Sequence, residues 1–433
     1  MPVEDRSDVQ GNAAVPNGYR ASPVGPIPKG WELVPFSELF EFKNGVNAEK
    51  RAYGYGVLFA NVLEVITNSH LRTTDIPGRV SLPKVLTELY RIRRGDVLFN
   101  RTSETQEEVG LASVYLDDDS AVFGGFVIRG RPKADSFDPI YAGYALRAPL
   151  VRAQIMAKGQ GAIRANIGQG DLRQVHVLRP QIEEQRAIAA ALSDVDGLIS
   201  MLCKLIGKKR AIKAATMQQL LTGKTRLPGF KGDWDVKRIG EFTDCTAGGT
   251  PSTSVPGYWG GSNRWMSSGE LNLKIVTEVE GRITDKGLYG SSAQMLPVSC
   301  VLIGLAGQGK TRGTVAINKV PLSTNQSIAA VYPDRSFCPE YLYYNLDTRY
   351  DELRSMSTGD GGRGGLNLKI IRAIAVPLPE LKEQIAIASV LSDMDAEIAA
   401  LERRRDKTKA IKQGMMRALL TGRIRLVKPE VSP

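Results

Sequence analysis

The apolar residues of two well-separated segments recur at the spacing of an amphipathic helix. They stand at Val195, Ile199, Leu202 and Ile206 in the first segment, and at Met394, Ile398 and Leu401 in the second. Steps of four and three residues place these side chains on one stripe, the seam of a coiled coil. The stripe then carries Lys209, Lys213, Arg405 and Lys412, and apolar residues resume at Ile212, Met217, Leu220, Ile411, Met416 and Leu419. The pattern predicts two long helices that pack on each other over part of their length and offer the rest to partners.

The two helical segments are copies of one sequence. No gap is needed to align "EEQRAIAAALSDVDGLISM…QQLLTGKTRL" on "KEQIAIASVLSDMDAEIAA…RALLTGRIRL", at an offset of 199 residues. A repeat of this length indicates two copies of one domain-plus-helix unit rather than a solenoid. Gly223 and Gly422 stand where a left-handed C-cap ends a helix. The pairs Ser193-Asp194 and Ser392-Asp393 are typical N-caps, so we expect each pair to divide a short first helix from a long second one.

The predicted long helix is comparable in size to a turn of DNA. From Val195 to its glycine cap it would have about 27 residues and measure roughly 40 Å. One turn of B-DNA measures about 34 Å. Such a helix could hold two domains on the same face of a duplex, one turn or more apart. The composition is equally consistent with a coiled-coil strut that joins domains and binds no DNA.

A β-rich stretch precedes each helical segment. It spans about 150 residues, with short alternating apolar runs and many glycines, which is typical of strands joined by turns. The two stretches begin alike, and Trp31 matches Trp234 at an offset of 203. Each tryptophan opens an alternating apolar run, which predicts a position in a core. The two stretches otherwise differ in sequence. This indicates a common frame that carries two different recognition domains.

These patterns together predict an α+β fold. Two β-rich globular domains are joined by two long antiparallel helices that form a coiled coil, in a pseudo-twofold internal repeat. The predicted segments are a disordered leader (1–29), a first globular domain (30–179), a first helical region (180–227), a second globular domain (228–378), a second helical region (379–427) and a tail (428–433). The leader is polar and rich in proline and glycine, a composition that favours disorder.

An apolar run leads into "GLAGQGKT", residues 304–311, which fits the phosphate-binding pattern G-x-x-x-x-G-K-[ST]. That site requires a helix directly after the lysine. The sequence that follows, "RGTVAINKVPLSTNQSIAAV", instead alternates as strands do. The matching loop of the first domain, "NRTSETQEEVG", lacks the motif, although Gly110 and Gly313 correspond at the offset of 203. We therefore predict two polar fingers that project from sheets, with a P-loop nucleotide-binding protein as the alternative.

Polar side chains of the types that contact base edges and phosphates gather in these loops. The candidates are Arg101, Thr102, Ser103 and Gln106 in the first domain, and Gln308, Lys310, Thr311, Arg312, Asn325 and Gln326 in the second, with Tyr258, Asn263, Arg264 and Ser267 from "GYWGGSNRWMSSGE". Two glycine-rich loops add Arg164 and Asn166 in the first domain and Arg363 and Asn367 in the second. These loops fit a clamp on the DNA backbone or a hinge, and for each single side chain a solvated surface position is the alternative.

The overall charge agrees with a polyanionic partner. Lys and Arg number 57 against 46 Asp and Glu, which gives a net charge of +11 and a pI of about 9.4. The four cysteines lack metal-ligand or disulfide-framework spacing, which fits reduced thiols in the cytoplasm. No apolar run is long enough for a membrane span, and the two histidines, His70 and His176, give no basis for a catalytic triad or metal centre.

These motifs resemble those of the specificity subunit of type I restriction-modification systems. The resemblance is carried by "EEQ", "AIA", "LSD" and "LLTG" in the repeats and by "GGTPSTS", "YWGG", "SSGEL" and "GQGKTRGTVAI" in the second domain, and it extends from about Trp31 to Leu426. It implies a non-catalytic DNA-binding chain whose two globular domains, the target-recognition domains, each read half of a split target.

The resemblance also implies partners. Besides double-stranded DNA, two methyltransferase subunits would dock on the helical repeats and methylate adenine N6 with S-adenosylmethionine. Restriction subunits would add translocation and cleavage that depend on ATP and Mg. These cofactors belong to the partner subunits, and none is expected in this chain.

Overall fold

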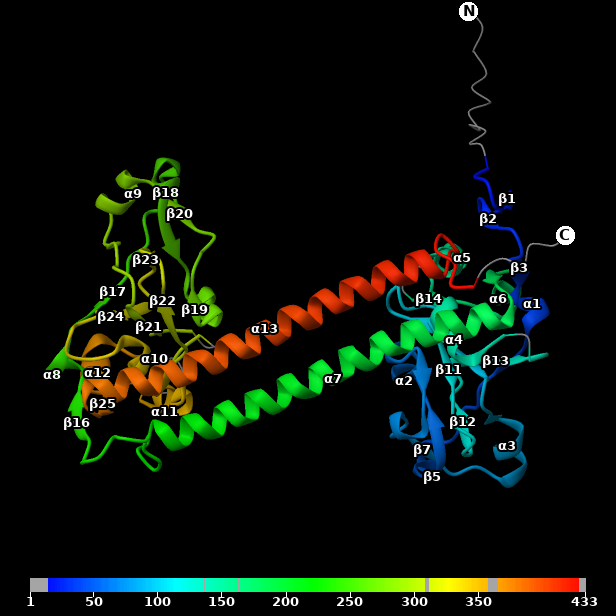
Figure 1. Ribbon diagram of the computed structural model, residues 1–433, viewed down its shortest axis with the longest axis horizontal. Coiled ribbons are helices and arrows are strands. Elements are labelled where there is room, and N and C mark those ends of the chain that lie inside the picture. The colour runs from blue at the N-terminus through cyan, green and yellow to red at the C-terminus, as the bar shows by residue number, and fades with distance from the viewer. Residues whose placement is uncertain are drawn as a thin grey trace, which may run out of the picture. The chain divides into compact units, whose positions relative to one another are not determined.

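The computed structural model describes residues 15–135, 137–159, 161, 164–307, 311–356 and 365–427 (Figure 1). The chain forms two packed units. One combines the described residues up to Met201 with those from Arg404 onward, and the other comprises Leu202–Arg403. Each unit contains a β-rich head and parts of two long helices, α7 (Ile182–Leu220) and α13 (Leu381–Leu419). The predicted α+β class with two long helices is confirmed. Each unit, however, combines a head with parts of both helical regions, which the predicted boundaries treat as separate segments.

The head of the first unit contains a five-stranded sheet of order β4-β13-β9-β11-β6 and a four-stranded sheet of order β7-β5-β12-β8. Its strands are β1 (Tyr19–Arg20), β2 (Ile27–Pro28), β3 (Glu32–Pro35), β4 (Phe40–Asn44), β5 (Tyr53–Ala60), β6 (His70–Leu71), β7 (Arg79–Val80), β8 (Arg91–Ile92), β9 (Val97–Asn100), β10 (Thr102–Ser103), β11 (Ala112–Tyr115), β12 (Ala121–Phe123), β13 (Val127–Pro132), β14 (Ala165–Asn166) and β15 (His176–Arg179). Its helices are α1 (Phe36–Leu39), η1 (Lys50–Ala52), α2 (Val62–Thr67), η2 (Thr73–Asp75), α3 (Lys84–Leu89), α4 (Pro139–Ala145), α5 (Pro149–Lys158) and α6 (Gln169–Arg173).

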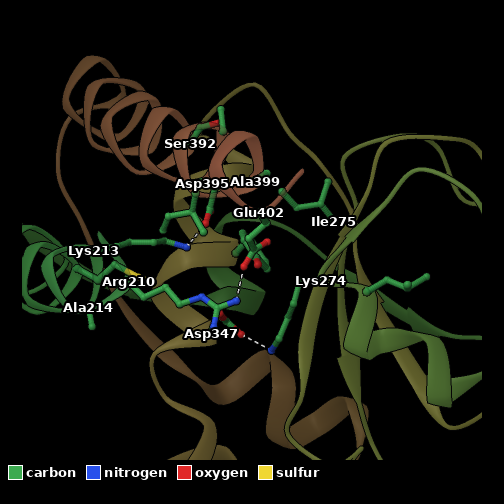
Figure 2. A pocket seen from close by; sticks show the side chains of 15 residues that line it. Arg210, Lys213, Ala214, Lys274, Ile275, Asp347, Ser392, Asp395, Ala399 and Glu402 are labelled. Carbon is green, nitrogen blue, oxygen red and sulfur yellow. Dashed lines mark hydrogen bonds and ion pairs between the residues drawn. The ribbon is translucent and has the colours of Figure 1, made fainter. Parts of the chain in front are cut away.

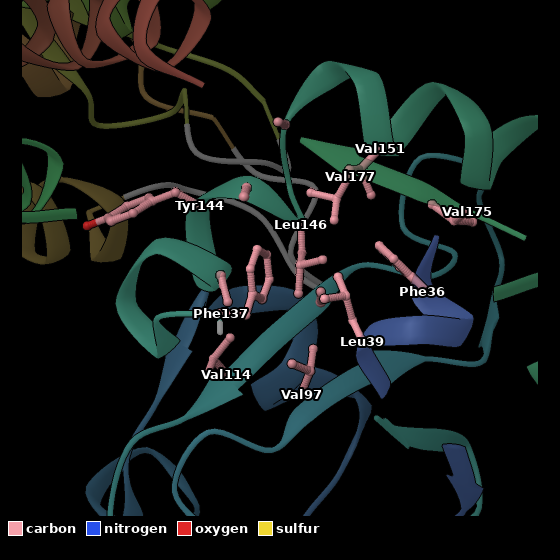
Figure 3. Close-up of a cluster of buried hydrophobic side chains, with 14 of the residues drawn as sticks. Phe36, Leu39, Val97, Val114, Phe137, Tyr144, Leu146, Val151, Val175 and Val177 are labelled. Atoms are coloured by element: carbon pink, nitrogen blue, oxygen red, sulfur yellow. The ribbon is translucent and has the colours of Figure 1, made fainter. Parts of the chain in front are cut away.

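The central strands β9 and β11 are buried at every position because both of their faces are covered. Along β9, Val97 and Phe99 enter one core, and Leu98 enters another on the opposite face. The first of these cores lies between the sheet and the helices α1, α4 and α5, as Figure 3 shows for Phe36, Leu146 and Val151. This close-packed frame holds β9 and β11, the two strands that flank the first finger.

The second unit repeats this plan with fewer strands. A five-stranded sheet has the order β17-β24-β21-β22-β19, and a three-stranded sheet has the order β20-β18-β23. The elements are β16 (Asp235–Arg238), α8 (Ile239–Phe242), β17 (Cys245–Ala247), η3 (Pro256–Tyr258), β18 (Trp259–Met266), η4 (Ser268–Leu273), β19 (Ile275–Val276), β20 (Arg282–Ile283), α9 (Asp285–Tyr289), β21 (Val301–Gly304), β22 (Val315–Asn318), β23 (Ser323–Thr324), β24 (Ile328–Val331), α10 (Pro339–Asp347), α11 (Tyr350–Ser355), α12 (Leu368–Ala373) and β25 (Ala375–Leu378).

Each long helix is continuous over 39 residues, so the predicted division at Ser193-Asp194 and Ser392-Asp393 is wrong. Ser and Asp cost a helix interior well under about 1 kcal/mol each. Burial of apolar residues on both sides of the pairs outweighs this cost, since Leu192 and Leu391 are fully buried directly before them and Leu202 and Ile398 are buried after them. The predicted caps are confirmed at the other end, where Gly223 and Gly422 have φ angles of 69° and 68°.

The two helices run antiparallel where they meet within the second unit. Lys209 pairs with Glu397 at 2.7 Å and Lys213 with Asp395 at 2.5 Å, and Arg210 pairs with Glu402. The predicted seam is confirmed by the burial of Leu202, Ile206 and Ile398. The lysines of the predicted stripe thus form ion pairs across this interface. Ile212 and Ile411 do not rejoin the stripe as predicted, because they are 42% and 49% exposed.

The C-terminal end of each long helix packs into the head that precedes the other long helix in sequence. The end of α13 enters the head of the first unit, and the end of α7 enters the head of the second unit. Leu419 and Leu420 of α13 belong to the core of the first unit. Leu220 and Leu221, at the end of α7, belong to the core of the second unit. The duplicated "LLTG" therefore acts as a plug for the head of the opposite repeat.

A tryptophan, a buried glutamate and an arginine secure each plug. In the first unit Trp31 donates to Glu184 at 2.8 Å, and Arg425 grips both oxygens of that carboxylate at 2.5 and 2.7 Å. In the second unit Trp234 and Arg226 bind Glu383 in the same way. Trp31 is 1% exposed, which confirms its predicted core position. We call these groups the first and second anchor.

The predicted leader is ordered from residue 15, so its description as disordered is wrong for residues 15–29. β1 pairs with β2, Ile27 is buried in the first core, and the Tyr19 hydroxyl donates to the carbonyl of Gly422 at 3.0 Å. The composition of the leader suggested disorder because an average over the whole segment hides the few apolar residues that dock on a preformed surface. Residues 1–14 lie outside the described part of the chain.

Candidate nucleic-acid interface

Two predicted polar segments of the first unit meet at one place, which we call the first junction. The chain leaves β9 at Arg101, whose amide donates to the carbonyl of Phe126 at 2.9 Å. The carbonyl of Arg101 accepts from the amide of Ile167 at 3.0 Å. Directly after this point β10 pairs with β14, with Thr102 opposite Asn166. The finger and the glycine-rich loop, whose paired residues are 64 positions apart in sequence, therefore form one surface.

The side chains of the first junction form a polar, cationic surface. Thr102 Oγ1 donates to Asn166 Oδ1 at 2.7 Å, and Asn166 Nδ2 donates to the carbonyl of Arg164 at 3.0 Å. Arg101, Asn166 and Gln106 are exposed, and Arg164 is 60% exposed although it lies 3.6 Å from Glu104. An exposed, weakly paired guanidinium can exchange its carboxylate partner for phosphate at small cost. These residues have the geometry for DNA contact.

Ser103 does not share this exposure. It is buried, and its hydroxyl donates to Glu108 Oε2 at 2.8 Å. The hydroxyl also accepts from the amide of Thr105. Ser103 therefore shapes the finger from inside, and the structure does not present it to a ligand as the sequence prediction required.

The second unit contains an equivalent second junction. The amide of Leu305 donates to Ser327 at 2.8 Å, and the carbonyl of Leu305 accepts from Leu366 at 2.9 Å. The predicted match of Gly110 with Gly313 is confirmed: both have positive φ angles, 62° and 78°, and each amide returns a hydrogen bond to the strand end, Asn100 or Gly304. The two fingers thus begin and end with equivalent backbone hydrogen bonds and carry different side chains.

The polar side chains of the second junction are largely engaged with their own backbone. Thr311 donates to Ala306, the Asn325 carbonyl oxygen accepts from Ser327, and Asn367 accepts from Ile370 as the N-cap of α12. Gln326 accepts a hydrogen bond from Thr250. Arg312 is 8% exposed, so it does not offer its guanidinium to DNA as predicted. The next residue, Gly313, packs against α11, where an added Cβ would lie 3.2 Å from Arg354 Cγ and from the carbonyl oxygen of Tyr350, so this end of the finger is covered by protein. Gln308, Lys310 and Arg363 lie outside the described residues.

The aromatic segment around β18 is held by intramolecular contacts. Arg264 forms two hydrogen bonds with Glu278, at 3.0 and 3.1 Å, and lowers the pKa of that carboxyl to about 2. Asn263 donates to Asp285 at 2.8 Å, and Ser267 donates to Glu270 at 3.0 Å. Tyr258 is half-buried against the glycines of α9. The predicted residues in this segment support its shape, and DNA could reach them only at their outer edges.

Comparisons with a family model and with known relatives agree with this arrangement of two similar junctions. The model of the type I restriction modification DNA specificity domain matches residues 231–412. The chain is 23% identical over 424 residues to the putative type I restriction enzyme MjaX specificity subunit of Methanocaldococcus jannaschii, which covers 94% of this chain and 97% of the relative. The MjaIX specificity subunit of the same organism is 34% identical over 170 residues, 38% of each chain. A solved S subunit of a type I restriction-modification system from M. genitalium aligns with a TM-score of 0.56 at 16% identity, over 90% of this chain and 96% of that one.

These matches identify residues 231–412 as a type I restriction modification DNA specificity domain, and over almost its whole length the chain is similar to type I specificity subunits. A specificity subunit recognises the DNA target of its complex and is not itself catalytic. In the described part of this specificity subunit, no helix is both long and apolar enough to cross a lipid bilayer. Nor do its described His, Cys, Asp and Glu side chains gather into a group of three that could hold a metal ion.

The P-loop alternative finds no support in this specificity subunit. Among the described residues that follow the "GQGK" run, Thr311–Gly313 form a turn and β22 begins at Val315, so the required helix is missing. A cavity of about 590 Å³ does exist elsewhere in the second unit (Figure 2). Its cations Arg210, Lys213 and Lys274 pair with Glu402, Asp395 and Asp347. These pairs neutralise the charge that nucleotide phosphates would need.

Sequence reasoning missed Phe126 of the specificity subunit. This residue lies at the first junction, in the position that Ser327 occupies at the second, and it is 56% exposed. A large apolar side chain beside Arg101 can lie against a sugar or a base. The available signal was "GGF" in the first domain, which stands between two apolar runs as "NQS" does in the second.

Proposed function

We propose that this specificity subunit reads a split DNA target with the first junction on one half and the second junction on the other. The observation that carries the proposal is the repetition of one junction backbone with different side chains. The first junction exposes Arg101, Arg164 and Asn166, whereas the second exposes Gln326, with Asn325 half-buried beside it. Arg favours guanine and Asn or Gln favours adenine in the major groove. A common backbone with different side chains is what two unlike half-sites require.

We further propose that two methyltransferase subunits bind this chain at equivalent places, one on each unit. Ile212 in the second unit and Ile411 in the first occupy the same position of the helical repeat. Both are exposed large apolar residues, at 42% and 49%. A repeat that exposes the same apolar residue twice offers two equivalent contact positions to two copies of one partner.

The experiment that tests the split target is a map of modified adenines in host DNA, with the gene present and deleted. We expect a motif of two short specific halves separated by an unspecified spacer, which disappears with the gene. A continuous motif, or an unchanged map, would contradict the proposal.

A double variant then assigns the halves. Arg101→Ala with Arg164→Ala should relax base preference in one half only, with a loss of about 1–3 kcal/mol for each base contact removed. Lys158→Ala is a suitable control, because Lys158 is a cation of the same head whose amine donates to Gln174. Equal loss in both halves would show that the first junction does not read one half by itself.

A further inference from the structure

The heads share a second repeated feature, a three-residue bulge in their smaller sheets. In the first unit both Tyr53 and Val57 lie opposite Val80 of β7, so residues 54–56 loop out of β5. In the second unit both Trp259 and Asn263 lie opposite Ile283 of β20, so residues 260–262 loop out of β18. Each bulged strand also pairs in parallel with a further strand, β12 or β23. We call these loops the first and second bulge.

The surroundings of the two bulges correspond in detail. A Cβ on Gly56 would lie 2.5 Å from the carbonyl oxygen of Val80, and a Cβ on Gly261 would lie 2.4 Å from that of Ile283. Tyr53 packs edge-on against Phe59 with ring centroids 5.4 Å apart. Trp259 and Trp265 repeat this contact at 5.0 Å. The first bulge is therefore the counterpart of the aromatic segment that the sequence singled out only in the second domain.

The bulges differ in what they present. The second contains Gly260, Gly261 and Ser262, whereas the first carries Tyr55 at its centre, 58% exposed. Gly54 and Gly56 have φ angles of 101° and 95°, which only glycine adopts readily, so they turn the chain outward on both sides of the tyrosine. The Arg79 guanidinium donates to the carbonyl of Gly56 at 3.1 Å and fixes the loop. Bulges of this kind re-aim a side chain.

The charge around Tyr55 is positive. Lys50, Arg51 and Arg79 are exposed on the adjoining elements η1 and β7. Glu49 pairs with Arg51 at 2.8 Å, but both side chains are more than 70% exposed, so phosphate could displace the carboxylate easily. Within the part of the chain that the structure describes, no ion pair ties Lys50 or Arg79 to a carboxylate. An exposed, rigidly held aromatic ring between cations is chemically suited to the groove and phosphates of a nucleic acid.

We propose that the first bulge is a DNA-contacting element, with Tyr55 in a groove of the half-site that the first unit reads and Lys50, Arg51 and Arg79 on the flanking phosphates. This inference rests on the proposed function, because it assumes that the first unit reads one half-site. Tyr55 has only two side-chain torsions to fix on binding, and its hydroxyl can donate to or accept from a base edge. The second bulge has no such side chain, so this contact distinguishes the two readers.

The test uses the full chain assembled with its methyltransferase partners and fluorescent duplexes that carry its mapped target. Three duplexes are compared: intact, with the first half scrambled, and with the second half scrambled. Tyr55→Ala should weaken binding of the intact duplex about tenfold, equivalent to ~1.4 kcal/mol. It should have no effect on the duplex whose first half is scrambled, where the contact is already lost. Val85→Ala is the matched control, because Val85 is an exposed apolar residue of the same head, on α3, and should bind as the wild type does.

A second readout separates the cations from the ring. Lys50→Ala with Arg51→Ala should reduce the slope of log affinity against log salt by about one to two, for one to two phosphates released. Wild-type affinity of Tyr55→Ala for the intact duplex, or an equal loss on all three duplexes, would overturn the inference. If the wild type itself does not distinguish the three duplexes, the proposed function fails. If the wild type does distinguish them and Tyr55→Ala is silent, only the bulge contact fails.

Discussion

Arg425→Ala isolates the contribution of the first anchor to the packing of the first unit. Arg425 makes two hydrogen bonds to Glu184, lies with its guanidinium carbon 5.5 Å from the centre of the Trp31 ring, and donates to the carbonyl of Lys29 at 3.4 Å. The Glu184 side chain is 2% exposed. Removal of the arginine would leave this carboxylate buried, with the hydrogen bond from Trp31 Nε1 still in place. The perturbation therefore creates an uncompensated buried charge.

The expected cost follows from the burial of each partner. Breaking a buried ion pair on one side costs about 3–5 kcal/mol. The Arg425 side chain is 22% exposed, so water can replace part of its contact with Glu184, and we expect about 2–3 kcal/mol for the first unit. For a unit of this size 1 kcal/mol corresponds to roughly 2–4 °C in Tm. The first unit should thus melt about 5–10 °C lower.

The assay must resolve the two units. Differential scanning calorimetry gives the melting transitions, and hydrogen exchange read by mass spectrometry shows which unit loosens. Peptides that contain Trp31 and Glu184 should exchange faster, and peptides that contain Trp234 and Glu383 should not change. Arg423→Ala is the control, because Arg423 is an exposed arginine of the same tail.

A double-mutant cycle decides whether the buried charge is the cause. In a Glu184→Gln background, Arg425→Ala should cost at least 1 kcal/mol less than it does in the wild type, since no carboxylate is left uncompensated. Equal costs in the two backgrounds would refute the reasoning and show that Arg425 acts through packing alone.

Three further predictions concern single residues. Burial lowers the pKa of His70, which is hydrogen-bonded to the carbonyl of Ile140 at 2.8 Å, so its stabilising effect is complete above the unfolded pKa of about 6.5 and is lost as the pH falls. Chemical denaturation at pH 7.5 and 5.5 should therefore show a smaller loss of stability in His70→Gln than in the wild type, and equal losses would contradict the assignment. Gly110→Ala should destabilise the first unit by about 2–3 kcal/mol and Gly313→Ala the second by about 1–2, because both have positive φ but only the first Cβ would collide, at 2.5 Å from Ile155 Cγ2. Thermal melting checks this order, and a reversed order would disprove it. Titration calorimetry should detect no binding of Mg-ATP by either the wild type or Lys310→Ala, and binding that Lys310→Ala abolishes would restore the P-loop alternative.

The candidate site shows where sequence reasoning succeeded and where it failed. The match of Gly110 with Gly313 located both fingers, because a positive φ at a turn imposes glycine whatever the neighbouring side chains are. The first bulge escaped notice, although "GRV" at residues 78–80 matches "GRI" at 281–283. Two-residue strands carry too little pattern to reveal that three residues of the opposite strand have looped out. Burial of Ser103 and Arg312 was equally invisible, because polarity indicates that a side chain needs partners and does not say whether water supplies them.

The sequence by itself determined the repeat, the helical stripe, the glycine caps and the equivalence of the fingers, because each depends on residues close in the chain or on a constant offset between copies. The tertiary structure alone decided that each helix runs unbroken through its Ser-Asp pair, since burial of Leu192 and Leu391 outweighs a weak local preference. It alone decided that each "LLTG" end enters the opposite repeat's head and that Thr102 meets Asn166. Such pairings are set by which distant surfaces exclude water together, a property that no single stretch of sequence contains.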